Sequence, residues 1–412
     1  MEYSIKLLLS IIILAVVSFV GARLNFLNKR LPLGVRTILL TGTEYIFLGV
    51  VLGRMGIDFI DTATLSQLEP FLLFALCWVG FMFGLQFEIK RLKKLPLFYF
   101  SITAVESIVT FLVVTIPLFF VLRYFKDYPD NMIIMMAAML GSTATATAQS
   151  SLAIINRLFQ FKTQNVMKLM RYVAGVDGVF ALVFFTLALI LVPWGDVSQV
   201  DIFGSLYWLF VLFVVGAVPA LVLILLNRRQ FTQQEFFVFL IGVTMFCAGL
   251  AHVTMHSPLV AGFICGILIA NFCEHRLRAL STVLHAEKTI YIALLVLVGA
   301  SWHIETPAVL IVALVYMLLK MGGKFFGGAL ATTIFKPVYH VPKTIGLGLV
   351  SEGGLAIAII INFKLLYFSL ADDLITIVIL AVLVSELFSP KLILAQFKKE
   401  DVVSLEGKKT LL

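Results

Sequence analysis

The chain has 412 residues, of which 61% are hydrophobic and only 13% are charged, with a formal net charge of +8. A soluble domain usually has roughly a quarter of its residues charged, so this composition excludes an ordinary soluble protein. The apolar residues come in runs of about 20, the length at which a helix crosses a hydrocarbon core, which also excludes the short alternating segments of an outer-membrane barrel. We therefore predict an all-α polytopic membrane protein.

The apolar runs predict about thirteen transmembrane helices. Lysine and arginine gather in alternate loops and in the C-terminal tail, whereas the loops between them are mainly acidic. Under the positive-inside rule this places the N-terminus outside and the C-terminus in the cytoplasm, and the net positive charge does not indicate nucleic-acid binding. The spans are centred near Ile12, Phe47, Cys77, Val109, Leu140, Leu182, Val214, Val243, Gly266, Leu295, Met317, Leu355 and Val378.

Ionisable side chains inside the spans are candidates for function, because they are costly to bury in a bilayer. Glu106 lies in the fourth span, where we favour a structural role beside a polar neighbour. Asp177 lies in the sixth span between Gly175 and Gly178, which permit close approach of another helix or an ion. Asp177 is therefore the leading candidate for an ion ligand.

The fifth span is unusual because hydroxyl groups interrupt it in mid-membrane. Ser142, Thr143 and Thr147 lie within a nine-residue segment, Gly141 to Gln149, in which threonine alternates with alanine. Repeated threonine lowers helix propensity and offers oxygen ligands. The segment predicts a discontinuous helix with these three residues as candidate ligands.

The eleventh and twelfth spans add further charges. Lys320 and Lys324 are four residues apart, so they share one face of a helix. Glu352 is followed by Gly353 and Gly354, which predict a second discontinuous helix in the twelfth span. In transporters such breaks mark the substrate site near the midplane. Thirteen spans divide into two six-helix repeats and a connector, which predicts inverted repeats with crossed discontinuous helices 5 and 12.

The depth of each group in the membrane indicates which of them can lie close together. Counted from the nearest cytoplasmic charge, Thr147, Asp177, Lys324 and Glu352 share a layer roughly 9–18 Å from the cytoplasmic boundary. A buried carboxylate can bind a proton or a cation but not both, so competition for Asp177 would exchange one for the other. Lys324 could pair with Asp177 when the ion is absent, whereas Lys320, one turn away, would be secondary.

In these residues the chain resembles the monovalent cation:proton antiporters, the sodium/hydrogen exchanger family, and within it the branch of bacterial potassium-efflux and sodium/proton antiporters. Asp177 resembles the ion-binding aspartate of the sixth helix. Val176 departs from the family, which has Asp, Asn or Gln before that aspartate, and Leu355 replaces an acidic residue. The other matching segments are Ser142-Thr143-Ala144, Gly323-Lys324 and Ser351-Glu352-Gly353-Gly354, the last resembling the family motif Ser-Gln-Gly-Gly-Glu-Phe.

The resemblance implies one transporter domain over residues 1–395 and a short cytoplasmic tail over 396–412. A scaffold through which such proteins form homodimers would comprise the helices of about 1–95 and 235–305. An ion-binding core would comprise about 96–195 and 306–395, with a connector helix at about 203–227.

The activity that the resemblance implies is exchange of Na⁺ or K⁺ for protons across a bacterial-type inner membrane by alternating access. Asp177 would be the ligand shared by cation and proton, and Lys324 its counter-charge. Oxygen ligands would come from Ser142, Thr143 and Thr147, with Glu352 and Lys320 as further candidates.

Two other classes stay open. One is a sodium-coupled organic-anion symporter of related fold, for which we would expect an arginine or paired asparagines at the crossing. The other is a cation channel or membrane-embedded sensor. Nucleotide-binding, zinc and nucleophile motifs are not apparent, so the sequence predicts no enzyme, no cofactor, no nucleotide-binding domain and no metal beyond the transported cation.

Overall fold

A computed structural model describes residues 2–23, 31–93, 96–125, 128–161, 164–191, 202–226, 232–273, 276–304, 306–337, 339–367, 372–397 and 402–404. Within these ranges the chain is mainly helical, with one two-stranded ribbon. The elements are α1 (Glu2–Arg23), α2 (Leu33–Thr41), α3 (Tyr45–Leu52), α4 (Thr62–Gln67), α5 (Glu69–Gln86), α6 (Ile89–Leu92), α7 (Leu97–Phe125), α8 (Asp130–Thr145), α9 (Gln149–Leu158), β1 (Phe159–Phe161), α10 (Asn165–Leu191), α11 (Ile202–Leu226), α12 (Gln233–Val253), α13 (Pro258–Phe272), α14 (Arg276–Ser301), α15 (Ala308–Phe335), η1 (Ile345–Leu349), α16 (Gly354–Leu366), α17 (Asp372–Leu394) and β2 (Val402–Ser404).

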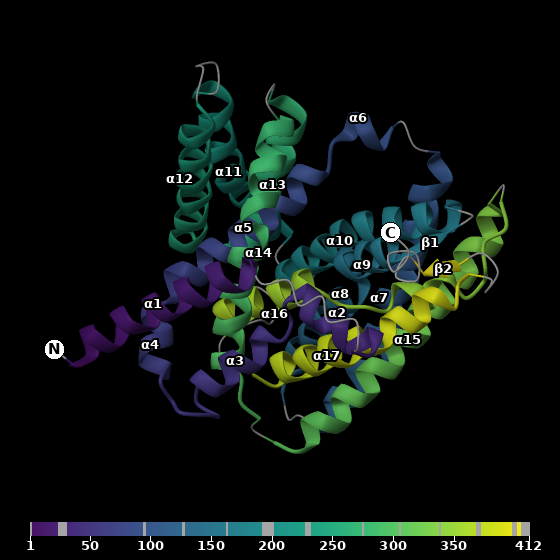
Figure 1. The fold of residues 1–412 in the computed structure, drawn as a ribbon, viewed down its shortest axis with the longest axis horizontal. Helices are drawn as coiled ribbons and strands as arrows, with labels where there is room; N and C mark the ends of the chain where they lie inside the picture. Colours follow the sequence, from purple (N-terminus) through teal and green to yellow (C-terminus); the bar gives the residue numbers. More distant parts are fainter. Residues whose placement is uncertain are drawn as a thin grey trace, which may run out of the picture.

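The helices form two groups (Figure 1). In the first, α5, α11, α12 and α13 pack on one another, with α14 against α5 and with α1 and α3 against α14. In the second, α7 packs on α8, α10 and α15, and α17 packs on α15 and α16. The first group lies in the predicted scaffold and connector and the second in the predicted core, while the division into functional domains stays a prediction.

Every predicted span centre lies within a helix. By length and composition, the described residues contain ten spans that can cross a membrane, one of them made of α8 and α9 together. The number is eleven if α2 and α3, bent by 67°, form one more span. Two further apolar helices, α13 and α16, are shorter, with 15 and 13 residues. The structure confirms a multi-pass helical membrane protein, whereas the number thirteen and the inverted repeat stay predictions.

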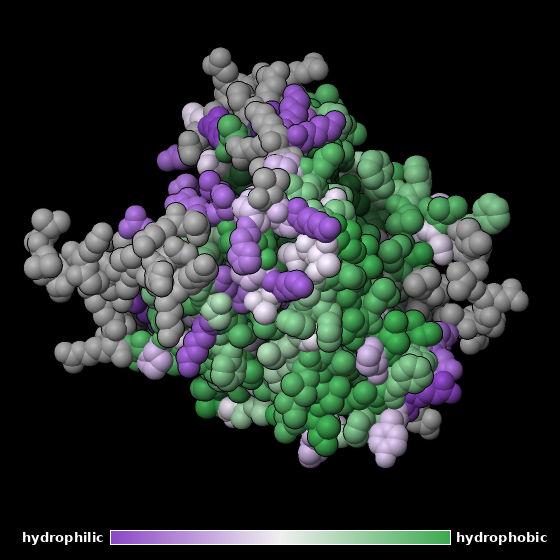
Figure 2. All heavy atoms as spheres, turned by 90° about the vertical axis from the view of Figure 1, so that its right-hand side faces the viewer, coloured by the Kyte–Doolittle hydropathy of each residue, from purple (hydrophilic) through white to green (hydrophobic). Residues whose placement is uncertain are grey.

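The outer surface is apolar, as lipid contact requires. Figure 2 shows a broad and nearly continuous hydrophobic face. On α7 the exposed side chains include Ile108, Leu112, Ile116 and Phe120. Their four-residue spacing places them on one side of the helix. Such a stripe, facing away from the protein core, would be unstable in water and is suited to a bilayer.

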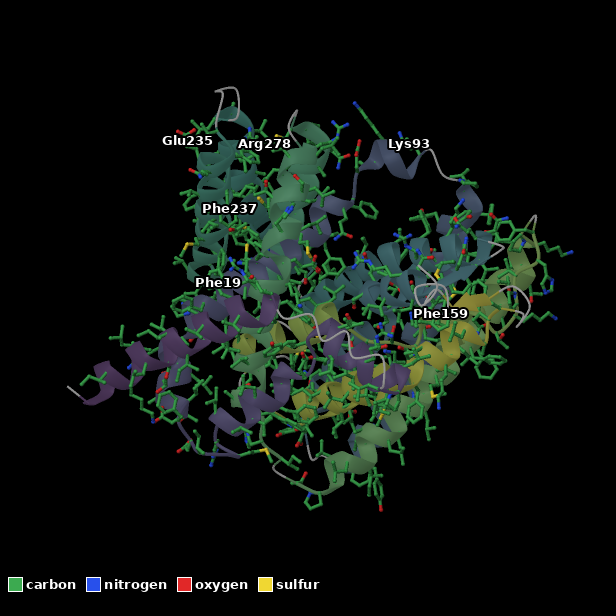
Figure 3. The ribbon with its side chains drawn as sticks, in the orientation of Figure 1. Phe19, Lys93, Phe159, Glu235, Phe237 and Arg278 are labelled. Atoms are coloured by element: carbon green, nitrogen blue, oxygen red, sulfur yellow. The ribbon has the colours of Figure 1, made fainter. Side chains whose placement is uncertain are left out.

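Two charged residues of the predicted cytoplasmic loops can be placed in the fold. Lys93, after α6, and Arg278, near the start of α14, lie at the same end of the molecule (Figure 3). Arg278 stacks its guanidinium 4.9 Å from the ring centroid of Phe236. The shared end agrees with the alternation of basic and acidic loops along the chain.

Glycine pairs bring α5 and α13 into backbone contact. Gly80 and Gly84 on α5 face Gly262 and Gly266 on α13, and a Cβ atom placed on any of the four would lie 1.9–2.3 Å from a carbonyl oxygen of the facing helix. Small residues four apart permit this approach in membranes, where packing must replace the hydrophobic effect. The close crossing ties together the first group of helices.

The C-terminal segment returns to the ends of the two broken spans. β2 pairs antiparallel with β1, which follows α9. Phe397 packs on Phe161 with ring centroids 4.4 Å apart, and Thr344, before η1, donates a hydrogen bond of 2.8 Å to Gln396. Most of the predicted tail, residues 398–401 and 405–412, lies outside the described ranges.

Candidate functional site

Two helix breaks cross inside the second group of helices. The chain is non-helical over residues 146–148, between α8 and α9, and over residues 350–353, between η1 and α16. The Ala148 N–H donates a 2.8 Å hydrogen bond to the carbonyl oxygen of Ser351. Each break frees backbone groups that a membrane interior cannot leave unpaired, and pairing across the crossing satisfies one donor and one acceptor. The predicted discontinuity of both spans is confirmed.

Asp177 lies on α10, fully buried, beside the first break. The Thr147 hydroxyl donates to its Oδ2 at 2.5 Å, and the Thr147 N–H points to Oδ1 at 3.4 Å. Because the break releases Thr147 from the backbone ladder of α8, its N–H and its hydroxyl both face the carboxylate. The same hydroxyl lies 3.1 Å from the carbonyl oxygen of Leu349, the last residue of η1 before the second break.

Lys324 on α15 is the cation of the site. Its Nζ lies 3.3 Å from Asp177 Oδ2 and 3.0 Å from Glu106 Oε1. The ammonium also donates to the Thr145 carbonyl at 2.6 Å and to the Thr147 hydroxyl at 3.0 Å. All three charged side chains are at most 1% exposed. A buried charge is tolerated only when it is paired and hydrogen-bonded, and Lys324 meets both conditions.

Glycines on α15 explain how Glu106 reaches Lys324. A Cβ atom at Gly327 would lie 2.8 Å from the Glu106 carbonyl oxygen, and one at Gly323 would lie 3.1 Å from Thr110 Cα. These two positions flank Lys324 and let α7 approach α15 closely. Thr110 then donates to Glu106 Oε1 at 3.2 Å. The structural partner that the sequence predicts for Glu106 is thus Lys324 itself.

A second buried ion pair lies one turn along α15. Lys320 Nζ is 2.7 Å from Glu352 Oε1, and the Tyr316 hydroxyl donates to the same oxygen. Tyr316 also shares a 3.0 Å hydrogen bond with Thr143. Because Tyr316, Lys320 and Lys324 are spaced by four residues, they form one polar stripe on α15. The two ion pairs are therefore neighbours joined by a single helix face.

The structure separates the three predicted oxygen ligands of the fifth span. Thr147 contacts Asp177, but the Ser142 hydroxyl donates to the Ala181 carbonyl at 2.6 Å. Thr143 donates to the Leu140 carbonyl at 2.8 Å and pairs with Tyr316. Among the described contacts neither Ser142 nor Thr143 reaches Asp177. Both precede the break, so their hydroxyls satisfy helix carbonyls and neighbouring helices instead.

The two glycines beside Asp177 differ in how closely neighbouring side chains approach them. A Cβ atom at Gly178 would lie 2.9 Å from the Leu355 side chain, so this glycine permits the predicted close approach. No atom lies within 4 Å of a Cβ atom at Gly175. Leu355, which stands where the family motif has an acidic residue, is 5% exposed and packs beside the site as an apolar cover.

One cavity, of about 260 Å³, reaches the helix breaks. It is lined by Thr147 and Gly353 from the second group of helices and by Glu287, Lys288 and Tyr291 of α14. A second cavity of about 460 Å³ is lined by residues such as His303, and neither Thr147 nor Asp177 lines it. The described structure thus opens the site along α14, whose first turns belong to a predicted cytoplasmic loop.

Tyr316 was not among the predicted site residues, and the sequence did not identify Lys324 as the partner of Glu106. Tyr316 could have been predicted from its four-residue spacing from Lys320, which places both on one helix face. The approach of Glu106 to Lys324 could have been predicted from Gly323 and Gly327, which mark a close helix contact beside Lys324. Among the described residues no group of three or more His, Cys, Asp or Glu side chains could hold a metal ion.

A comparison with protein-family models decides the family. Residues 7–394 match the model described as the sodium/hydrogen exchanger, transmembrane. The chain belongs to the sodium/hydrogen exchanger family. The resemblance drawn from Asp177, Lys324 and the two helix breaks is confirmed at this level, and the family consists of transporters, not enzymes.

Solved structures of this fold agree with the family. The sodium/proton antiporter MjNhaP1 from Methanocaldococcus jannaschii, solved at pH 8, matches with a TM-score of 0.67 and 15% identity, covering 95% of this chain and 99% of that one. A second structure of the same antiporter, from electron microscopy, matches with a TM-score of 0.58 and 15% identity, covering 86% and 91%. No curated protein sequence matches this exchanger-family chain significantly.

Proposed function

We propose that this protein exchanges cytoplasmic Na⁺ or K⁺ for external protons by alternating access, with Asp177 as the ligand that the cation and the proton share. Membership of the sodium/hydrogen exchanger family supports cation:proton antiport. The observation that carries the site is the buried Asp177 carboxylate beside Thr147 at the crossing of two helix breaks, next to the cavity along α14.

Lys324 and Glu106 explain how the site tolerates both of its occupants. With no cation bound, the Lys324 ammonium neutralises Asp177. A monovalent cation would take the Asp177 carboxylate together with the Thr147 hydroxyl oxygen and nearby carbonyl oxygens, the hard ligands that such ions prefer. Lys324 would then keep Glu106 as its partner. Neither state leaves an ammonium group buried without a carboxylate.

The test is a flux measurement in proteoliposomes with an imposed proton gradient, with Na⁺, Li⁺ and K⁺ added separately. We expect one or more of these cations to dissipate the gradient for the wild type but not for Asp177→Asn. Asp61→Asn is the matched control, because Asp61 pairs with Lys6 near the surface at 2.6 Å, far from the site in the fold. Its flux should equal that of the wild type.

Loss of flux in both variants would point to general damage and not to the site. No cation-linked flux from folded wild-type protein would overturn the exchanger proposal and favour an organic-anion symporter. The described charges disfavour that alternative, because each buried lysine of the site already pairs with carboxylates: Lys324 with Asp177 and Glu106, Lys320 with Glu352.

We further propose a homodimer in a bacterial-type inner membrane, with the N-terminus outside and the C-terminus cytoplasmic. The alternation of basic loops supports the orientation, and the first group of helices would supply the dimer contact. A C-terminal fluorescent fusion should fluoresce only if that end is cytoplasmic, and cross-linking in membranes should yield a dimer. A dark fusion or a purely monomeric product would contradict the respective proposal.

A further inference from the structure

A carboxylic acid remains that the proposed exchange does not use. Glu386 on α17 is 1% exposed. The Thr41 hydroxyl donates to its Oε2 at 2.9 Å, and the Thr43 hydroxyl donates to the same oxygen. Both threonines lie at the bend between α2 and α3. Two donors on one oxygen leave the other oxygen of Glu386, Oε1, to be accounted for.

Oε1 of Glu386 has no hydrogen-bond partner among the described residues, although it is fully buried. Nor does any described lysine, arginine or histidine nitrogen lie within 4.0 Å of the Glu386 carboxylate, in contrast to Asp177, Glu106 and Glu352. Burying an ionised carboxylate without a cation costs much free energy, whereas burying the neutral acid costs far less. Oε1 is the oxygen free to accept a proton.

Glu386 lies where α17 packs tightly against α2 and the bend that follows it, a contact that we call the seam. A Cβ atom at Gly34 on α2 would lie 2.2 Å from the Leu387 carbonyl oxygen on α17, so the two backbones are in direct contact. The seam joins a helix of the predicted core to a bend in the predicted scaffold. Thr41 also lines the cavity that reaches Thr147, so the seam borders this cavity.

The ionisable groups around this seam carry both signs of charge. Glu44, at the N-terminus of α3, and Tyr291 on α14 lie within electrostatic range of Glu386. The other ionisable groups on elements that pack around the seam are Arg36 on α2, Glu287 and Lys288 on α14, exposed Arg157 on α9, and the Lys320–Glu352 pair. The Glu352 N–H donates a hydrogen bond to Ser385 on α17.

We propose that Glu386 is a second proton-binding site of this protein, separate from Asp177, and that its proton holds α17 against the α2–α3 bend. The inference rests on the proposed function, because a seam between core and scaffold matters only if the two parts move. The neutral acid accepts both threonine hydrogen bonds and keeps the seam closed. Loss of the proton leaves a buried, unpaired charge, which is relieved only when the seam opens to water.

The protonation of Glu386 in the closed seam determines the direction in which pH changes turnover. The closed seam favours the protonated acid, so the closed state predominates at acidic pH and is lost as the pH rises through the pKa of Glu386 in that state. Since alternation requires the core to move, turnover should rise with pH. Glu386→Gln keeps the carbonyl acceptor for the threonines but cannot ionise, so it should hold the seam closed at every pH.

The decisive experiment is the pH profile of cation-linked flux for three variants. Glu386→Gln should transport, but its rate at alkaline pH should stay near the acidic wild-type rate. Thr43→Val removes one hydrogen bond from the closed seam and should raise the acidic rate by roughly two- to tenfold. Asp61→Asn is the control for removal of a carboxyl away from both the seam and the cavity, because Asp61 pairs with Lys6 near the surface, and its profile should match the wild type.

Hydrogen exchange of residues 33–52, corrected for the intrinsic pH dependence of amide exchange, gives a readout independent of flux. The segment should become less protected at alkaline pH in the wild type but not in Glu386→Gln. A wild-type pH profile, or wild-type exchange kinetics, in Glu386→Gln would overturn the proposal. These outcomes differ from failure of the proposed function, in which the wild type itself shows no cation-linked flux at any pH.

Discussion

At the scale of single residues, the site depends on an ammonium group that two carboxylates share. Lys324 lies 3.0 Å from Glu106 and 3.3 Å from Asp177, with all three side chains buried. Removing one member of a buried ion pair leaves an uncompensated charge, which usually costs far more than the pair itself contributes. The three side chains should therefore behave as one energetic unit.

Lys324→Ala should lower the free energy of unfolding by about 3–5 kcal/mol, because it leaves two facing carboxylates without a cation. Adding Glu106→Gln should recover part of that loss. The shift of the thermal midpoint in detergent measures both effects. Lys6→Ala is the control, because its partly exposed pair with Asp61 should contribute at most about 1 kcal/mol. Additive losses in the double variant would contradict the shared unit.

At the scale of elements, the helix breaks and the glycine contacts have different origins. The α8–α9 break follows from local sequence, since the repeated threonines have low helix propensity and their hydroxyls compete for backbone carbonyls. The α5–α13 contact depends on two pairs of glycines that meet only in the fold. Their spacing is visible in the sequence, but the partner helix is not, because each helix could offer such a face to several neighbours.

Gly84→Ala should destabilise the protein by about 1–3 kcal/mol, because the new methyl group would lie 2.2 Å from the Phe263 carbonyl oxygen, and backbone must move to admit it. Gly249→Ala on α12 is the matched control. Nothing lies within 4 Å of its Cβ position, so the change should be neutral or stabilise by up to about 1 kcal/mol. Equal thermal midpoints for the two variants would refute the contact.

At the scale of the whole molecule, the charges buried around the crossing of the two helix breaks nearly cancel. Asp177, Glu106 and Glu352 face Lys320 and Lys324 across the two ion pairs. With all five ionised, the cluster carries one net negative charge, which one proton or one monovalent cation neutralises. Moving a neutral cluster through the bilayer interior avoids a large cost of desolvation.

The charge count predicts electroneutral exchange of one cation for one proton. Solid-supported-membrane recordings should then show no sustained charge displacement at cation concentrations that produce full flux in proteoliposomes. Asp177→Asn, which we expect to abolish flux, sets the background. A current whose sign follows the cation gradient would exclude one-for-one exchange and imply that a second proton moves with the core.

The sequence alone determined the membrane class, the two discontinuous spans and the family, and it singled out Asp177 and Lys324 as candidate site residues. These follow from local physics: apolar length, helix-breaking composition and the cost of a charge in lipid act on each segment separately. Only the tertiary structure decided which partners those residues have. It gave Lys324 a second carboxylate, turned Ser142 and Thr143 away from Asp177, and buried Glu386 against the α2–α3 bend, because such contacts join residues that are distant along the chain.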